Sequence, residues 1–145
     1  MGSNEFDRLK LKNQLCFPLY SAAREVVKKY RPYLDPIGLT YTQYITMMVL
    51  WEERDITVKA LGERLFLDSG TLTPVLKSLE TKGYVVRKRN SVDERSVLVT
   101  LTNAGECLKE KAKDVPLQIA QCVGLDADEA ATLYALLYKV LGVNE

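Results

Sequence analysis

The sequence predicts one mostly α-helical domain, covering residues 1–145, with a small β-hairpin wing. The length of 145 residues suits a single domain with a buried core of its own. Apolar residues recur at three- and four-residue steps over most of the chain, which is the helical period. Between Tyr84 and Leu101 the pattern changes to two β-branched runs around a polar turn, as in a hairpin.

The first expected helix covers about residues 13–31. Leucine, alanine and valine follow the helical period there, and Asn13 is the expected start. Pro18 lies inside the stretch, where proline is tolerated only in the first turn or at a kink. The dipeptide Arg31-Pro32 is the expected end, because the residue before a proline is disfavoured in a helix.

Each of the later helices is preceded by a Thr, Ser or Asp whose side chain can cap the first turn. Two of these residues, Thr40 and Asp126, also have a Gln or Glu three positions later, which makes a capping box. Gly83 and Gly142 supply helix stops, and Pro116 predicts a kink. The expected helices are about 41–53 after Thr40, 58–66 after Thr57, 69–82 after Asp68 or Ser69, 103–122 after Thr102, and 127–141 after Asp126.

Two short helices followed by a hairpin form the pattern of a winged helix-turn-helix, which we assign to about residues 40–101. The second helix of such a pair enters the major groove of DNA. The flanking helices, about 13–31 and 103–145, are too apolar to stand alone in water. We therefore expect them to pair in a homodimer, which also suits two-fold DNA sites.

Composition excludes several classes of function. The chain has no histidine, so it has no histidine general base and no histidine-containing metal site. Its three cysteines are too far apart for a zinc site, and we expect no metal and no cofactor. No apolar run is long enough to span a membrane or to act as a signal peptide, so we expect a cytoplasmic protein.

A local basic patch favours DNA as the partner, although the whole chain carries only +1. Between Lys82 and Arg95 there are five basic residues and two acidic ones, Asp93 and Glu94. Arginine at a hairpin tip can enter the minor groove, and hydroxyls at a helix N-terminus can bind phosphate. The candidate DNA-contacting residues are Ser69, Thr71, Thr73, Lys77, Arg87, Arg89, Asp93 and Arg95.

Cys16 is a candidate reactive cysteine. If Asn13 caps the first helix, Cys16 lies in the first turn, where the helix dipole and free N–H groups stabilise a thiolate. A thiolate is the form that attacks peroxides and becomes a sulfenic acid. The alternative is an ordinary buried cysteine that acts as a small apolar residue.

The segment from Asp68 to Glu80, followed by Gly83 and by Asp93-Glu94-Arg95, resembles the MarR family of winged-helix repressors. The resemblance covers nearly the whole chain. It implies that Arg95 reaches the minor groove and that Asp93 helps to hold the wing. It also implies a transcriptional regulator rather than an enzyme.

The segments 13–17, 19–21 and 38–44 resemble the organic-hydroperoxide-sensing branch of that family. This resemblance implies that Cys16 is the reactive cysteine and that Tyr30 and Tyr41 of the facing subunit hydrogen-bond its sulfur, with Tyr20 in the same pocket. Some members of the branch use a second, resolving cysteine near the C-terminus, and Cys122 lies close to that place. Pro18 departs from the pattern of the branch.

The resemblance implies a repressor that binds operator DNA when reduced and is released when organic hydroperoxides oxidise Cys16. Three alternatives remain open. The protein can be a MarR-type repressor that answers a small phenolic ligand without redox chemistry. It can also be a thiol peroxidase that uses Cys16, which the basic wing argues against, or a DNA-coating protein, which the net charge of +1 argues against.

Overall fold

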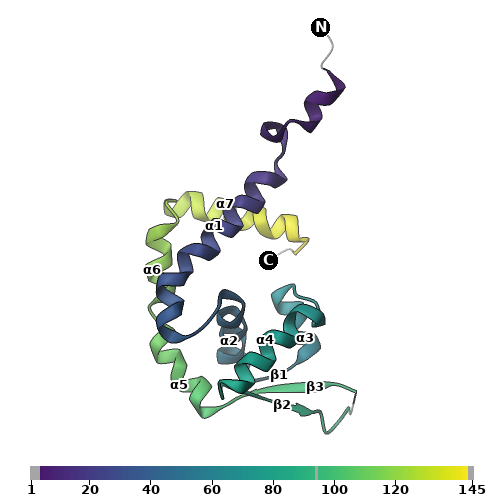
Figure 1. Cartoon of the computed structure of the whole chain (residues 1–145), viewed down its shortest axis with the longest axis vertical. Helices are drawn as coiled ribbons and strands as arrows, with labels where there is room; N and C mark the ends of the chain where they lie inside the picture. The colour runs from purple at the N-terminus through teal and green to yellow at the C-terminus, as the bar shows by residue number, and fades with distance from the viewer. Residues whose placement is uncertain (1–3, 94, 144–145) are drawn as a thin grey trace.

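Helices make up most of the computed structural model, which describes residues 4–93 and 95–143, and a small antiparallel sheet lies at one end of the molecule (Figure 1). Two short 3₁₀ helices precede the first α-helix, and a third lies between the first and second α-helices. Glu94, one residue of the expected wing motif, lies outside the described residues. In chain order the elements are η1 (Glu5–Leu9), η2 (Leu11–Asn13), α1 (Cys16–Leu34), η3 (Asp35–Ile37), α2 (Tyr41–Glu53), β1 (Asp55–Thr57), α3 (Val58–Leu65), α4 (Ser69–Thr81), β2 (Val85–Arg89), β3 (Val97–Leu101), α5 (Asn103–Ala112), α6 (Val115–Cys122) and α7 (Ala127–Leu141).

The start of α1 differs from the expectation. The helix begins at Cys16, and its N-cap is Leu15, which makes no side-chain cap bond. Asn13 instead ends η2 and donates its side-chain amide to the Asp7 carbonyl at 2.7 Å. Because α1 starts this late, Pro18 falls in its first turn, where a missing N–H costs no intrahelical bond. Pro18 is therefore compatible with the helix.

The expected end of α1 at Arg31-Pro32 is also wrong, because the helix continues through Pro32 to Leu34. Pro32 removes one N–H from the last turn only. The Asp35 N–H still bonds to the Arg31 carbonyl, and Leu34 is buried. Burial of that leucine in the core stabilises the extra turn against the proline.

The capping predictions for the later helices are confirmed. Both expected capping boxes form, at Thr40 with Gln43 and at Asp126 with Glu129. Between the two candidates for α4 the cap is Asp68, whose carboxylate accepts the Thr71 N–H at 2.7 Å. Local side-chain chemistry therefore sets most helix starts in this chain.

The expected long helix after Thr102 is two helices. It breaks at Lys113–Asp114, so that α5 ends at Ala112 and α6 begins at Val115. Pro116 then occupies the first turn of α6, where it is favourable, and a kink at Pro116 is not needed.

The sheet has three strands in the order β1-β3-β2, all antiparallel. The hairpin of β2 and β3 was expected, but β1 was not, because three residues carry too short a pattern to detect. In β1, Ile56 pairs with Val99 of β3. Since β1 lies between α2 and α3, this pairing connects the hairpin to those two helices.

The core joins the α3–α4 helix pair and the hairpin to the terminal helices. Leu72, Leu76 and Leu79 of α4 are buried and Val75 is half-buried, so the expected apolar stripe of that helix faces inward. The indole N–H of Trp51 donates to the Gly105 carbonyl at 2.9 Å, which links α2 to α5. None of the helices within the described part of the chain is long and apolar enough to cross a membrane.

Candidate DNA-binding surface and cysteine site

The helix pair α3 and α4 is joined by a tight turn. Phe66 has a φ of 55°, and the Leu67 N–H bonds back to the Gly62 carbonyl at 3.0 Å. Gly62 permits this closeness, because a Cβ there would lie 2.7 Å from the Leu67 carbonyl oxygen. The turn thereby holds α4 at a fixed angle to α3, as a helix-turn-helix requires.

The outer face of α4 carries the polar residues that the sequence singled out. The side chains of Ser69, Thr71 and Lys77 are exposed. Thr73 is half-buried, and its hydroxyl donates to the Ser69 carbonyl at 2.7 Å. Three of the four expected groups are therefore on the surface, and the Thr73 hydroxyl is used within the helix.

The tip of the wing is organised by Asp93. Its carboxylate accepts the Arg95 N–H at 3.0 Å, and its carbonyl accepts the Ser96 N–H at 3.0 Å. Arg95 itself is exposed beside this turn, and Arg89 is exposed at the end of β2. Arg89 and Arg95 therefore lie on the two sides of the hairpin turn, and Asp93 holds the backbone of that turn.

Arg87, another of the expected DNA contacts, is paired with Glu80 in the single chain. Its Nη2 donates to Glu80 of α4 at 3.3 Å, and its backbone N–H donates to the other Glu80 oxygen at 3.0 Å. These bonds hold the pKa of the Glu80 carboxyl below its ordinary value. Within the described residues, the Arg87 Nε is buried without a hydrogen-bond partner. Arg87 therefore joins α4 to β2, a role that counting charges did not reveal.

Cys16 is the first residue of α1 and is exposed. Although Asn13 does not cap this helix, Cys16 still lies in the first turn, where backbone N–H groups lack helical acceptors. The dipole argument for a stabilised thiolate therefore keeps its geometric basis.

Three tyrosines cluster where α1 meets α2. The rings of Tyr30 and Tyr41 lie 4.8 Å apart, and those of Tyr30 and Tyr44 lie 5.7 Å apart. Burial, with a smaller effect from the neighbouring phenols, raises the pKa of Tyr30 to about 12. Burial also raises the pKa of Tyr41. Both phenols therefore stay protonated at neutral pH and remain hydrogen-bond donors.

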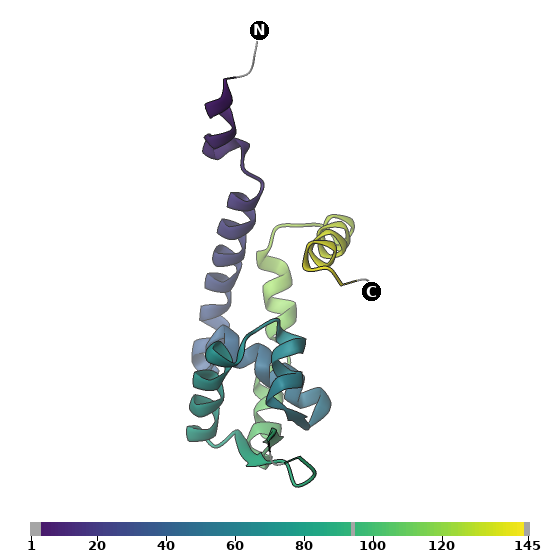
Figure 2. The ribbon, with the colours of Figure 1, turned by 90° about the vertical axis from the view of Figure 1, so that its right-hand side faces the viewer.

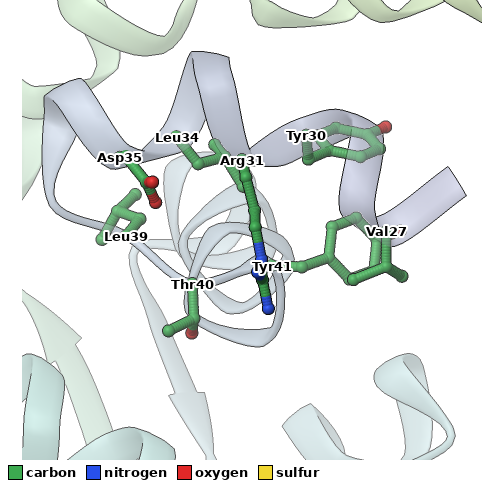
Figure 3. A pocket seen from close by; sticks show the side chains of 8 residues that line it. All are labelled: Val27, Tyr30, Arg31, Leu34, Asp35, Leu39, Thr40 and Tyr41. Carbon is green, nitrogen blue, oxygen red and sulfur yellow. The ribbon is translucent and has the colours of Figure 1, made fainter. Parts of the chain in front are cut away.

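A cavity of about 200 Å³ adjoins these tyrosines at the junction of α1 and α2. Tyr30, Tyr41, Leu34 and Leu39 contribute to its wall, and Figure 3 shows Arg31 extending from α1 toward the first turn of α2. Its lining is mostly apolar and includes two charged side chains, Arg31 and Asp35.

One chain does not bring Cys16 to the tyrosines. Tyr30 lies fourteen positions after Cys16 on α1, a span of about 21 Å along the helix. Tyr20 is exposed, and its hydroxyl accepts from Arg24 at 3.3 Å. Only a second copy of the chain can place Tyr30 or Tyr41 against the Cys16 sulfur.

Cys122, at the end of α6, has a partner that the sequence did not indicate. Its sulfur lies 3.5 Å from the Tyr33 hydroxyl of α1 and 3.3 Å from the Gln118 carbonyl. The contact with Cys122 raises the pKa of Tyr33. Cys107 is exposed on α5. No local signal predicts the Tyr33 contact, because 89 residues separate the two side chains in the sequence.

An apolar groove runs along α1 and α7. It has a volume of about 570 Å³. The α1 side of the groove is a stripe at helical spacing, and Leu133 and Leu137 of α7 line it too, together with Tyr41 of α2. The α1 residues are Leu15, Pro18, Leu19, Ala22, Ala23, Val26 and Val27.

Comparisons with known proteins agree with this architecture. The family model described as "Transcriptional regulator SarA/Rot" matches residues 26–112. The organic hydroperoxide resistance transcriptional regulator of Bacillus subtilis is 49% identical over 138 residues, which cover 95% of this chain and 94% of that protein. A MarR mutant from Escherichia coli, solved with operator DNA, is 32% identical with a TM-score of 0.81 and covers 96% and 99% of the two chains.

The chain belongs to the MarR family of winged-helix transcriptional regulators. Membership in this family agrees with the expectation of a regulator rather than an enzyme. Another similar structure, reduced AbfR bound to DNA, is 36% identical with a TM-score of 0.78 and covers 96% of this chain and 97% of that one. The disulfide-formed AbfR gives a lower TM-score of 0.62, at 36% identity and with 94% and 92% covered. AbfR comes from Staphylococcus epidermidis.

Proposed function

We propose that this protein is a cytoplasmic, homodimeric repressor that binds operator DNA when reduced and leaves it when an organic hydroperoxide oxidises Cys16. The observation that carries the proposal is that Cys16 and Tyr30, the one cluster tyrosine on α1, lie near opposite ends of that helix, with an apolar stripe between them. The names of the similar proteins, a hydroperoxide resistance regulator and DNA-bound reduced AbfR, support the same function.

The spacing along α1 specifies how two copies pair. Cys16, Ala23 and Tyr30 are seven residues apart, so they lie on one face of the helix. If two α1 helices pack antiparallel about a two-fold axis at Ala23, Cys16 of each chain faces the partner's Tyr30. The small side chains of Ala22 and Ala23 at the midpoint let the two backbones approach closely. Each dimer then has two equivalent sensor sites.

The redox step uses the thiolate of Cys16. The thiolate attacks the terminal oxygen of the hydroperoxide and breaks the O–O bond, and the alkoxide takes up a proton and leaves as the alcohol. Sulfur is oxidised by two electrons to a sulfenic acid, and the peroxide is reduced. The Tyr30 and Tyr41 phenols of the partner subunit donate hydrogen bonds to the sulfur or to its new oxygen. Condensation of the sulfenic acid with Cys122 of the partner subunit forms a disulfide and releases water.

The DNA step uses α4 and the wing. In the dimer the two α4 helices enter adjacent major grooves about one helical turn apart, or about 34 Å. Ser69, Thr71 and Lys77 contact phosphates and base edges, while Arg89 and Arg95 supply charge along the wing. Movement of the terminal helices after oxidation changes the spacing of the two α4 helices and weakens binding.

The test compares operator binding before and after oxidation. The probe is a fluorescent duplex selected from a random pool by the reduced protein. Cumene hydroperoxide should release the wild type and dithiothreitol should restore binding. Cys16→Ser should bind the duplex and stay bound when the oxidant is added. The matched control Cys107→Ser should be released like the wild type. A wild type that stays bound after oxidation would refute the redox function.

The same assay distinguishes the redox repressor from a repressor that responds to a phenolic ligand. A phenolic ligand such as salicylate, added without oxidant, should leave the reduced wild type on the duplex. Release of both the wild type and Cys16→Ser by salicylate, with no effect of the hydroperoxide, would favour the phenolic-ligand repressor instead.

A further inference from the structure

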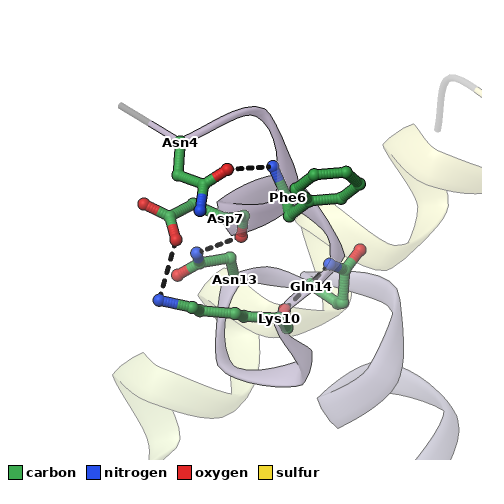
Figure 4. A network of polar contacts seen from close by, with 6 residues as sticks. All are labelled: Asn4, Phe6, Asp7, Lys10, Asn13 and Gln14. Atoms are coloured by element: carbon green, nitrogen blue, oxygen red, sulfur yellow. Dashed lines mark hydrogen bonds and ion pairs between the residues drawn. The ribbon is translucent and has the colours of Figure 1, made fainter. Parts of the chain in front are cut away.

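The N-terminal segment, residues 4–14, is folded on itself and is here called the arm. The Asn13 side-chain amide donates to the Asp7 carbonyl, and Gln14 donates to the Lys10 carbonyl (Figure 4). Gln14 also donates to the Arg8 carbonyl. Asp7 also pairs with Lys10 at 2.7 Å. These bonds give the arm a defined shape even though it projects beyond the rest of the molecule, in line with α1 (Figures 1 and 2).

The arm exposes large apolar side chains. Leu9 is 77% exposed and Leu11 is 58% exposed, and Leu15, where the arm meets α1, is 82% exposed. Ordered backbone with exposed leucines is costly in water, because each exposed leucine forgoes a burial worth about 1.5–3 kcal/mol. The arm therefore has the character of a surface that is covered by a partner.

The cavity beside Tyr30 is open in the single chain and has groups that lack partners. Neither Arg31 nor Asp35 forms an ion pair with any residue that the structure describes. The wall between them is apolar and includes Leu34 and Leu39. A leucine side chain could pack against this apolar wall, and polar groups on either side of it could meet Arg31 and Asp35.

We infer that the arm of each chain closes this cavity on the second copy, so that the sensor site is completed by the partner's arm. The inference rests on the pairing proposed above. With Cys16 facing the partner's Tyr30 and the helices antiparallel, residues before Cys16 run beyond the partner's Tyr30. Leu11 then lies about 8–10 Å past Cys16, level with the partner's Asp35.

Charge and shape agree with that position. Lys12 of the arm, which forms no ion pair within the described residues, comes next to the partner's Asp35. Leu11 and Leu9 meet the apolar wall of the partner's cavity. Because only Leu15 separates the arm from Cys16, the closed cavity lies beside the reacting sulfur and shields it from one side.

Cysteine cross-linking tests where the arm of one chain lies along α1 of the partner. One protein carries Leu11→Cys and Asp35→Cys with the three native cysteines changed to serine. A disulfide within one chain is impossible there, because positions 11 and 35 lie about 30 Å apart or more along the arm and α1. Mild oxidation with copper phenanthroline should give a reducible dimer on a gel. The matched control, Leu11→Cys with Lys28→Cys, lies about 10 Å out of register and should cross-link at most weakly.

A second pair separates this inference from the proposed dimer. Tyr30→Cys with native Cys16, and serine at the other two cysteines, should also cross-link. If this pair cross-links and the 11–35 pair does not, the arm lies elsewhere and the inference is wrong, although the helix pairing is right. If neither pair cross-links, the proposed pairing itself is wrong, and the inference falls with it.

The rate at which Cys16 is alkylated gives an independent measure of whether the arm shields its sulfur. In a protein whose only cysteine is Cys16, Leu9→Ser with Leu11→Ser should speed iodoacetamide labelling of Cys16 several-fold. Val92→Ser, which changes a side chain that is 93% exposed on the wing, is the control and should leave the rate unchanged. Equal labelling rates for the arm variant and its parent, with a dimer in both by sedimentation, would overturn the inference.

Discussion

The Glu80 carboxylate on α4 accepts two hydrogen bonds from Arg87 on β2, one from the backbone N–H and one from the guanidinium. The pair connects the helix expected in the major groove to the strand that leads to the wing tip. We expect Arg87→Gln to weaken operator binding by loosening the wing. Since Arg87 is held by Glu80, the dependence of log Kd on log salt should keep its wild-type slope. A slope lower by about one would instead make Arg87 a phosphate contact.

Arg95 should behave differently from Arg87. Its side chain is exposed at the wing tip, and it contributes to no core contact. Arg95→Ala should therefore weaken operator binding and lower the salt slope by about one, while the thermal unfolding midpoint stays within error of the wild type. Fluorescence anisotropy over a range of salt concentrations measures both quantities. Wild-type affinity together with the wild-type slope would remove Arg95 from the interface.

Tyr30→Phe and Tyr41→Phe each delete one phenol while keeping the ring that packs in the cluster. Both variants should fold and bind DNA as the wild type does. Oxidation of Cys16 by cumene hydroperoxide should be slower in each, because one hydrogen-bond donor to sulfur is lost. Trapping the sulfenic acid with dimedone over time gives the rates. Equal rates in both variants and the wild type would show that these phenols do not contact the sulfur.

The Tyr33–Cys122 contact bears on the second oxidation step. We expect hydroperoxide to produce a reducible dimer on a non-reducing gel, and we expect Cys16→Ser and Cys122→Ser each to abolish it. Cys107→Ser should leave it intact. Tyr33→Phe should speed its appearance, because the phenol no longer holds the Cys122 sulfur against α1. A dimer band lost only in Cys107→Ser would transfer the resolving role to Cys107, and no band in the wild type would indicate a one-cysteine sensor.

Gly105 is the most crowded glycine in the described chain. A Cβ there would lie 2.3 Å from the Tyr84 carbonyl oxygen and 2.6 Å from a Leu101 methyl carbon. Gly105→Ala should therefore destabilise the fold by about 1–3 kcal/mol, the usual range for overpacking. Gly70→Ala is the matched control, because its nearest new contact is 3.4 Å, and it should be neutral or stabilising. Urea unfolding measures both, and equal midpoints would contradict the crowding argument.

The sequence predicted most of the fold because local chemistry sets most of the element boundaries. Thr40, Thr57 and Asp126 cap the helices expected of them, since a side-chain oxygen three residues from a free N–H needs no tertiary context. Asn13 failed as a cap because its amide found the Asp7 carbonyl instead. That competition between nearby acceptors is invisible in the residue pattern.

The site was harder to predict than the fold. Charge counting placed Arg87 with the other basic residues of the hairpin, but it cannot distinguish an arginine facing solvent from one held by Glu80. The Tyr33–Cys122 contact joins α1 to α6 and depends on how the helices pack, so no spacing rule reveals it. Cys16 was identified from its expected place in the first helical turn and from resemblance, whereas Tyr30 was identified by resemblance alone. The structure places both residues on the one helix α1.

The position of Ala23 midway between Cys16 and Tyr30 has a genetic consequence. In the proposed dimer each sensor site takes its sulfur from one chain and its phenol from the other. A mixed dimer of one Cys16→Ser chain and one Tyr30→Phe chain therefore holds one site with both defects and one site with neither. Two alleles that each impair the response should complement one another in a cell that expresses both, whereas two alleles of the same position should not.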